Sequence, residues 1–180
     1  MDTFSAAVSA VECDAAMAVP GAVRRDAVDA EMLYFEDLEV GDSWTSRPRR
    51  ITADDVSQFA ELTGDHTSLH DDERPSPFGK PIAHGLLGLS ILAGLSSMRP
   101  QVATLALSQL EDWRFEAPIF FGDTVHVRTE VVQSESHGRR AGRIVWHRQL
   151  INQDGRVVQS GRIVTIVSSR ARSGGSVRPR

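Results

Sequence analysis

Two short segments of the chain carry residue types that could activate a water molecule beside a carbonyl group. One is the run GDHTSLH at residues 64–70, and the other is AHGL at residues 83–86. A carboxylate can orient a water by accepting one of its protons, and an imidazole can exchange the other near neutral pH. Asp65 and His70 are therefore the candidate catalytic pair.

The spacing of Asp65 and His70 permits such a pair but does not require it. Five residues place two side chains about 140° apart around a helix and on opposite faces of a strand. The two side chains can converge only where the backbone turns between them. Gly64, Thr67 and Ser68 are residue types that favour a turn.

His84 and Gly85 stand where a long apolar helix is predicted to begin. The first N–H groups of a helix have no partner within it, and the helix dipole favours negative charge there. Glycine lets a substrate approach the backbone closely. We therefore expect the amide of Gly85 to stabilise the negative charge that develops on a substrate carbonyl oxygen.

Each candidate also has a purely structural interpretation. Asp65 could cap the turn that follows it, His70 could be a partly buried packing residue, and His84 could be an N-cap or a packing residue. His66 is predicted to be exposed. No spacing typical of a metal site, such as HExxH, is present, so no metal ligands are expected.

Two helices are predicted around these segments. The first begins after Thr52, whose hydroxyl can cap it, and ends at Gly64. Its apolar positions at helical spacing are Val56, Phe59, Ala60 and either Leu62 or Thr63. The second, about residues 85–97, is apolar on nearly every side, which is typical of a helix in a core.

Four segments with strand-like patterns follow, separated by turns that contain glycine. They are residues 104–115, 124–133, 143–151 and 157–167. One apolar helix with several long strands predicts an α+β fold, in which a meandering antiparallel sheet wraps around the helix. Such a sheet has free edges, and pairing of two subunits is one way to cover them.

Composition excludes several classes of protein. A chain of 180 residues with 41% hydrophobic content can bury one core, and a net charge of −4 gives no reason to expect binding to nucleic acid or to a membrane surface. Cys13 is the sole cysteine, so no disulfide framework is expected. We find no signal peptide and no membrane-spanning stretch, so the expected location is cytoplasmic.

The expected domain organisation is one folded unit with an extension at each end. Residues 1–30 are rich in Ala, Val and Asp and have little periodicity, which predicts a disordered extension. Residues 31–169 form the predicted domain. Residues 170–180, with their Ser and Gly cluster and terminal arginines, read as a flexible basic tail.

Five ordered motifs give the segment 34–169 a resemblance to a known family. They are FEDLEVGD at 35–42, GDxxxLH at 64–70, PFGKPIAHGLL at 77–87, WRFEAP at 113–118 and FGDTV at 121–125. This pattern resembles the MaoC-like dehydratases, the hot-dog-fold (R)-specific enoyl-CoA hydratases and their relatives. The resemblance implies a long central helix wrapped by a curved antiparallel sheet, with units paired as a homodimer or a dimer of dimers.

The same resemblance implies a reaction and roles for residues. Asp65 and His70 would hold the catalytic water, and the Gly85 N–H would stabilise a thioester enolate. Ala83, His84 and Leu86 beside that amide are the expected substrate-binding residues. The expected reaction is reversible hydration of a trans-2-enoyl thioester, carried by CoA or a carrier protein, to the (R)-3-hydroxyacyl thioester. The resemblance implies a lyase of fatty acid metabolism, and no cofactor is expected.

The chain departs from the family pattern at three places. Thr67 and Ser68 replace the usual Asn-Pro, the segment between His70 and His84 is shorter than usual, and Ala93 replaces a serine found in some hydratases. The catalytic pair survives these changes, while the acyl specificity does not follow from the pattern. Two alternative functions are a hot-dog acyl thioesterase and a non-catalytic partner subunit of an active hydratase.

Overall fold

The structure is a computed structural model that describes residues 32–70 and 77–170. The predictions for the extension at residues 1–30, for Cys13 and for the tail beyond residue 170 lie outside the described residues. The same holds for residues 71–76, which form part of the shortened segment between His70 and His84.

Two α-helices and six strands make up the described chain, with two short 3-10 helices, Phe35–Asp37 and Ser68–His70. In chain order the main elements are β1 (Ser43–Thr45), β2 (Arg49–Arg50), α1 (Ala53–Thr63), α2 (Gly85–Met98), β3 (Thr104–Phe115), β4 (Thr124–Ser136), β5 (Ala141–Ile151) and β6 (Val157–Ser168).

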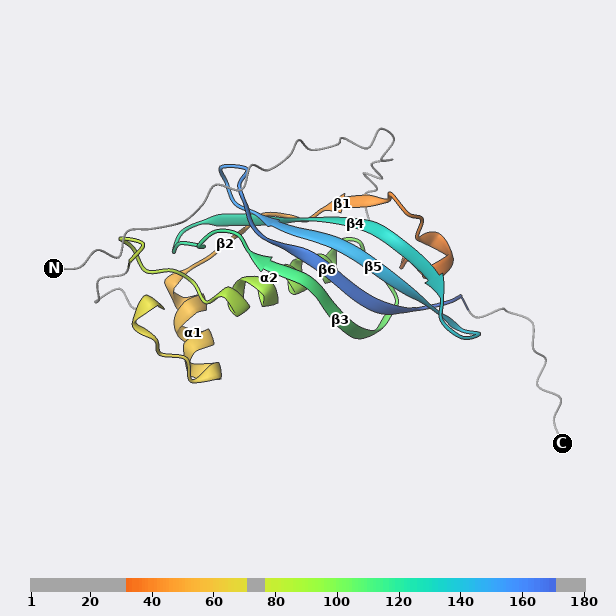
Figure 1. Cartoon of the computed structure of the whole chain (residues 1–180), viewed down its shortest axis with the longest axis horizontal. Coiled ribbons are helices and arrows are strands. Elements are labelled where there is room, and N and C mark those ends of the chain that lie inside the picture. The colour runs from red at the N-terminus through yellow and green to blue at the C-terminus, as the bar shows by residue number, and fades with distance from the viewer. Residues whose placement is uncertain (1–31, 71–76, 171–180) are drawn as a thin grey trace, which may run out of the picture.

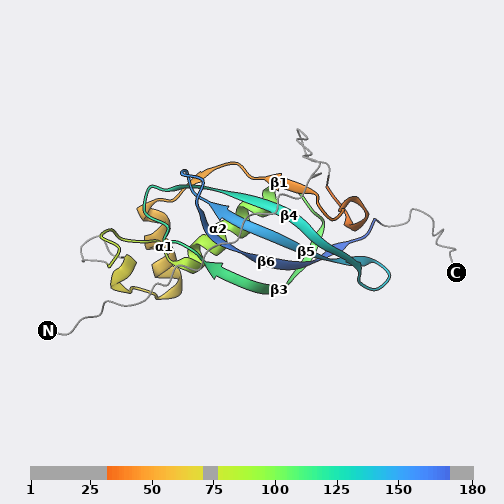
Figure 2. The same ribbon diagram turned by 45° about the horizontal axis from the view of Figure 1, so that its top comes forward.

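The strands form one antiparallel sheet in the order β1-β4-β5-β6-β3, and β2 pairs with β4 beside it. Figures 1 and 2 show α2 running along one face of this sheet, while α1 lies beyond one end of the strands. β3 lies at one edge of the sheet and pairs with β6. The next strand in the chain, β4, lies on the far side of the sheet, and β5 and β6 fill the positions between them. The α+β prediction is confirmed.

The first helix forms as its sequence predicts. Thr52 accepts a hydrogen bond from the Asp55 N–H, and the Asp55 carboxylate accepts one from the Thr52 N–H, which completes a capping box. Gly64 ends the helix with a φ of 76°, a left-handed conformation that glycine adopts without strain. Leu62 is 82% exposed, so the predicted apolar stripe is shorter than the spacing suggested.

The main core lies between α2 and the sheet. Leu87, Ile91 and Leu92 of the helix pack with inward side chains of the strands, among them Val127 and Leu150. These side chains alternate along their strands, because successive residues of a strand face opposite sides. A second cluster lies farther along the sheet, where the Trp44 and Trp146 rings pack edge to face with 6.3 Å between their centroids.

The second helix and the last four strands lie close to their predicted bounds, whereas the short strands β1 and β2 were not predicted. One stripe of α2 is exposed in the single chain, and so are the apolar side chains of β3. This differs from the expectation of a helix buried on every side. Within the described residues, no helix is both long enough and apolar enough to span a bilayer.

Candidate active site

The turn between α1 and the site is built by Asp65 and Thr67. Oδ1 of Asp65 accepts hydrogen bonds from the Thr67 N–H at 3.2 Å and from the Thr67 hydroxyl at 2.6 Å. The 3-10 turn Ser68–His70 follows at once, and the His70 N–H donates to the Thr67 carbonyl at 3.0 Å. This turn reverses the backbone between Asp65 and His70, as convergence of the two requires.

Asp65 is half-exposed, with 49% of its side chain accessible. The two Thr67 hydrogen bonds hold the pKa of the Asp65 carboxyl below its usual value, and the nearby His84 and His70 imidazoles act in the same direction. The carboxyl is therefore ionised at neutral pH and can accept a proton of a bound water. Its second oxygen, Oδ2, lies 4.0 Å from Nε2 of His84.

One hydrogen bond settles which nitrogen of His70 is available. Nδ1 lies 2.7 Å from the carbonyl oxygen of Ile82, and a carbonyl can only accept, so Nδ1 carries the proton. In the neutral ring, Nε2 is then an acceptor. The Ile82 N–H donates in turn to the Leu69 carbonyl at 3.0 Å, which fixes the two segments to each other.

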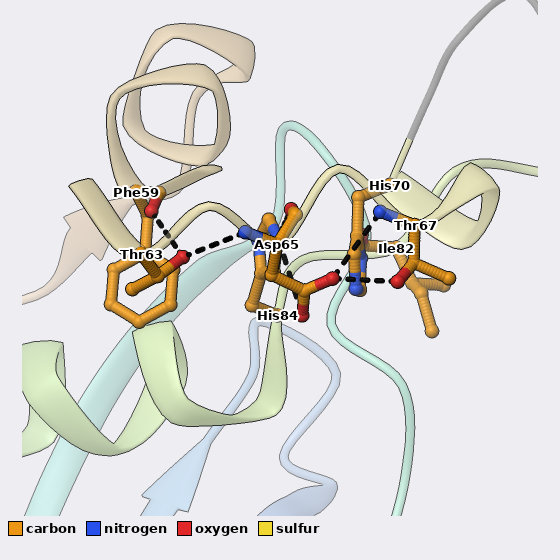
Figure 3. A network of polar contacts seen from close by, with 7 residues as sticks. All are labelled: Phe59, Thr63, Asp65, Thr67, His70, Ile82 and His84. Carbon is orange, nitrogen blue, oxygen red and sulfur yellow. Dashed lines mark hydrogen bonds and ion pairs between the residues drawn. The ribbon is translucent and has the colours of Figure 1, made fainter. Parts of the chain in front are cut away.

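His84 is a buried residue that joins the two segments of the site. It is 3% exposed, and its Nε2–H donates to the backbone carbonyl of Asp65 at 2.9 Å. Its ring stacks on that of His70, with 3.6 Å between centroids and 28° between planes, and lies 5.2 Å from the Phe59 ring (Figure 3). His84 occupies the N-cap position of α2 without a side-chain cap, and its ring contacts the two segments of the site instead.

Gly85 is the first residue of α2 and faces a cavity of about 340 Å³. Ala83, Phe115 and Gln159 also line this cavity. A first-turn N–H has no partner within its helix, so the Gly85 amide can donate to a ligand. A Cβ at Gly85 would lie 2.9 Å from the Phe115 ring, so only glycine fits there without displacement.

The predicted site residues therefore come together, with one exception. Asp65, His70 and His84 form one cluster, and Ala83 and Gly85 border the adjoining cavity. Leu86 is 61% exposed and is absent from the residues that line this cavity. His66, predicted to be exposed, is exposed.

Gln159 is a site residue that the sequence reasoning missed. It is 1% exposed on β6, and its Nε2 donates to the Gly85 carbonyl at 2.9 Å, while its Oε1 is buried without a partner among the described residues. A side-chain amide at an inward position of an apolar strand was the available signal. It did not reveal which backbone group the amide would hold.

The cluster also has the residue types of a metal site. One ligand atom from each of Asp65, His70 and His84 lies within 4.8 Å of the others. However, the His84 nitrogen that lies 4.0 Å from the Asp65 carboxylate is Nε2, and it donates its proton to the Asp65 carbonyl. A ring nitrogen that carries a proton cannot bind a metal ion. Asp65 and Nε2 of His70 can instead hold a water.

Comparisons with known proteins give the same assignment as the motifs. Residues 38–147 match the family model described as MaoC like domain. The chain is 38% identical over 117 residues to the 3-hydroxybutyryl-CoA dehydratase of Methylorubrum extorquens, covering 63% of this chain and 73% of that protein. It is 34% identical over 100 residues to the (R)-specific enoyl-CoA hydratase of Aeromonas caviae, covering 53% and 72%.

Solved structures agree with this match. The MaoC-like dehydratase from Rhodospirillum rubrum superposes with a TM-score of 0.70 at 29% identity, covering 77% of this chain and 99% of that one. A Mycobacterium tuberculosis protein described as a double hot-dog fold gives a TM-score of 0.66 at 20% identity, covering 83% and 47%. The chain carries the hot-dog fold and belongs to the MaoC-like dehydratase family.

Proposed function

We propose that the protein is an enoyl-thioester hydratase that adds water reversibly to a trans-2-enoyl thioester and forms the (R)-3-hydroxyacyl thioester. The observation that carries this proposal is the cluster of an ionised carboxylate, Asp65, with an imidazole whose Nε2 is free to accept, His70, beside the Gly85 amide. Neither side chain has to move to bind a water.

The steps follow from the positions of these groups. The Gly85 N–H donates to the thioester oxygen and draws electron density from the C2=C3 double bond. Asp65 accepts one proton of the water and His70 Nε2 accepts the other, so the water oxygen is directed at C3. The C–O bond forms as the π electrons move to the enolate, and the water O–H bond breaks as its proton passes to Asp65 or His70. That group then returns the proton to C2 on the same face, which restores the site.

Names of relatives support this chemistry. The relatives reported above are named as a dehydratase of 3-hydroxybutyryl-CoA and an (R)-specific hydratase of enoyl-CoA. A CoA thioester is therefore the first substrate to test, and a carrier-protein thioester is the second. We propose a reaction that needs no cofactor and a site that holds water instead of a metal ion, so a chelator should leave the rate unchanged.

The direct test follows the enoyl chromophore of crotonyl-CoA and longer enoyl-CoAs. Asp65→Asn and His70→Ala should each lose about 10²- to 10⁴-fold in rate, because each removes one contact to the water. His66→Ala, at an exposed neighbour in the same turn, is the matched control. Unchanged rates in folded Asp65 and His70 variants would refute the site. Release of free thiol with the chromophore intact would favour the thioesterase alternative.

We also propose that two copies pair along β3. This strand lies at the edge of the sheet, and Leu105, Leu107, Leu110 and Phe115 on it are 43–63% exposed. An open apolar edge strand is a surface that proteins cover. Sedimentation should give a dimer or a dimer of dimers, and Leu105→Lys should shift the equilibrium toward the monomer.

A further inference from the structure

A second cavity, of about 420 Å³, lies between α2 and the sheet. Small residues of the helix, among them Ser90, Ala93 and Ser97, leave the space, and apolar residues of the strands, among them Leu107 and Ile163, form the opposite wall. Arg148 of β5 also lines it. A cationic side chain in an apolar cavity is the feature that needs an explanation.

Arg148 has no acidic partner in the part of the chain that the structure describes. Its Nε is buried without a hydrogen bond, and its guanidinium carbon lies 5.4 Å from the Trp146 ring. None of the described residues lining the cavity is an Asp or a Glu. Burial lowers the pKa of the Arg148 guanidinium to about 10, so the group is still charged at neutral pH.

The cavity lies along the same two elements, α2 and β6, as the Gly85 cavity. Leu89 lines it and stands one helical turn after Gly85, about 6 Å along the α2 axis, while Ser97 lies about 18 Å along. On β6, Ile163 of this cavity and Gln159 of the Gly85 cavity are four residues apart on the same face. An acyl chain that ran from the Gly85 cavity to the Arg148 cavity would lie between these two elements.

We propose that Arg148 binds a carboxylate at the far end of the acyl chain, so that the protein selects thioesters of dicarboxylic acids over plain fatty acyl thioesters. A guanidinium suits a carboxylate because its N–H groups match the two oxygens. The inference rests on the proposed function only in placing the thioester at Gly85. The apolar walls then hold the methylene groups between the two ends of the substrate.

The test measures binding, so it does not depend on turnover. Wild-type protein is titrated with saturated thioesters that cannot be hydrated, in pairs of equal length: glutaryl-CoA with pentanoyl-CoA, and adipoyl-CoA with hexanoyl-CoA. In at least one pair we expect the thioester with the free carboxylate to bind at least about tenfold more tightly than its uncharged partner. A charge-assisted hydrogen bond in an apolar cavity is strong enough for this. Preference for the neutral member, or no preference, would overturn the proposal.

Variants identify the residue responsible. In Arg148→Met the ratio of the two affinities should fall to about one, and Arg148→Lys should keep part of it. Arg162→Met is the matched control, because Arg162 is 52% exposed on the opposite face of β6 and should keep the full ratio. Arg148→Met should fold, since it removes a charge that has no acidic partner among the described residues and leaves an unbranched apolar side chain against Trp146.

Two further results would assign Arg148 to another partner and so refute the proposal. CoA without an acyl group is titrated as well, and if its affinity falls in Arg148→Met, then Arg148 binds a phosphate. Sedimentation of the same variant is compared with wild type. If Arg148→Met no longer forms the dimer, and wild type shows no preference for thioesters with a free carboxylate, then Arg148 binds a carboxylate of a second copy.

The proposed reaction can fail separately. If the protein has no hydratase activity but still prefers thioesters with a free carboxylate, only the proposed reaction is refuted.

Discussion

The two halves of the candidate site are held in different ways. The turn that carries Asp65 and His70 is half-exposed, and the hydrogen bonds that shape it join residues two or three apart in the chain, while Ile82 holds its far end. The start of α2 is held by residues distant in sequence, with Gln159 on the Gly85 carbonyl and Phe115 against its Cα. His84 belongs to the second half and reaches the first through the Asp65 carbonyl.

This difference explains why the turn can change its sequence while the helix start has little freedom. Thr67 supplies two donors to Asp65 from a position where the family pattern has another residue type, because any local donor of suitable length can close such a turn. At the helix start the contacting residues His84 and Gln159 are buried, so water does not replace a lost contact there. Substitutions of positioning residues should therefore act more strongly at the helix start than in the turn.

Apart from the catalytic pair itself, the largest effect is expected at Gly85. Gly85→Ala places a methyl group 2.9 Å from the Phe115 ring, which must displace the ring or the helix start. A shift of about 1 Å in a positioning group lowers kcat/KM by about 10²-fold. Steady-state kinetics on an enoyl-CoA will measure this fall in kcat/KM. Gly94→Ala in the same helix is the control, because nothing lies within 4 Å of the position its Cβ would take. It should leave kcat/KM unchanged and raise the free energy of unfolding by about 0.5–1 kcal/mol, measured by thermal unfolding.

His84→Phe tests the link between the two halves. Phenylalanine can keep the stack on His70, but it cannot donate to the Asp65 carbonyl, which is then unpaired. The bond to this carbonyl is part-buried, and a lost hydrogen bond of this kind costs about 0.5–1.5 kcal/mol, so most of the fold should be retained. We expect a loss of up to about tenfold in kcat, because Asp65 is no longer held against the start of α2. A rate equal to that of the wild type would mean that the two halves are positioned independently.

Gln159→Met removes the side-chain donor beneath Gly85 at nearly constant volume. The Gly85 carbonyl loses one contact, yet the unpartnered Oε1 is removed as well, so stability should change by less than about 1 kcal/mol. We expect kcat/KM to fall about fivefold, as for the loss of one neutral hydrogen bond. Gln133→Met, at an exposed position of β4, should change neither quantity.

The smallest effect is expected at Thr67, where it appears mainly in the pH profile. The Thr67 hydroxyl favours the ionised form of Asp65, so its loss in Thr67→Val, which keeps the backbone N–H donor, raises the pKa of that carboxyl toward its usual value. The acid limb of the kcat/KM profile should move to higher pH, with little change at neutral pH, where the carboxyl is ionised in both proteins. Thr67→Ser keeps both donors and should leave the limb in place; a shift in Thr67→Ser alone would contradict this account.

Much of the fold was predictable because its signals are local. The cap at Thr52, the stop at Gly64 and the alternating strands each depend on neighbours within one element, and the structure has them where they were predicted. The strands β1 and β2, of three and two residues, were not predicted, because their pairing with β4 is a long-range contact. Leu62 fits the apolar spacing of α1 but projects beyond the core.

The sequence alone determined the residue types of the site and the turn that allows Asp65 and His70 to meet, because glycine, threonine and serine act on the backbone beside them. Only the tertiary structure decided which ring nitrogen of His70 is free, that His84 stacks on it, and that Gln159 holds Gly85. Those features join residues up to 74 positions apart. Their geometry follows from how the helix packs on the sheet, which no local pattern records.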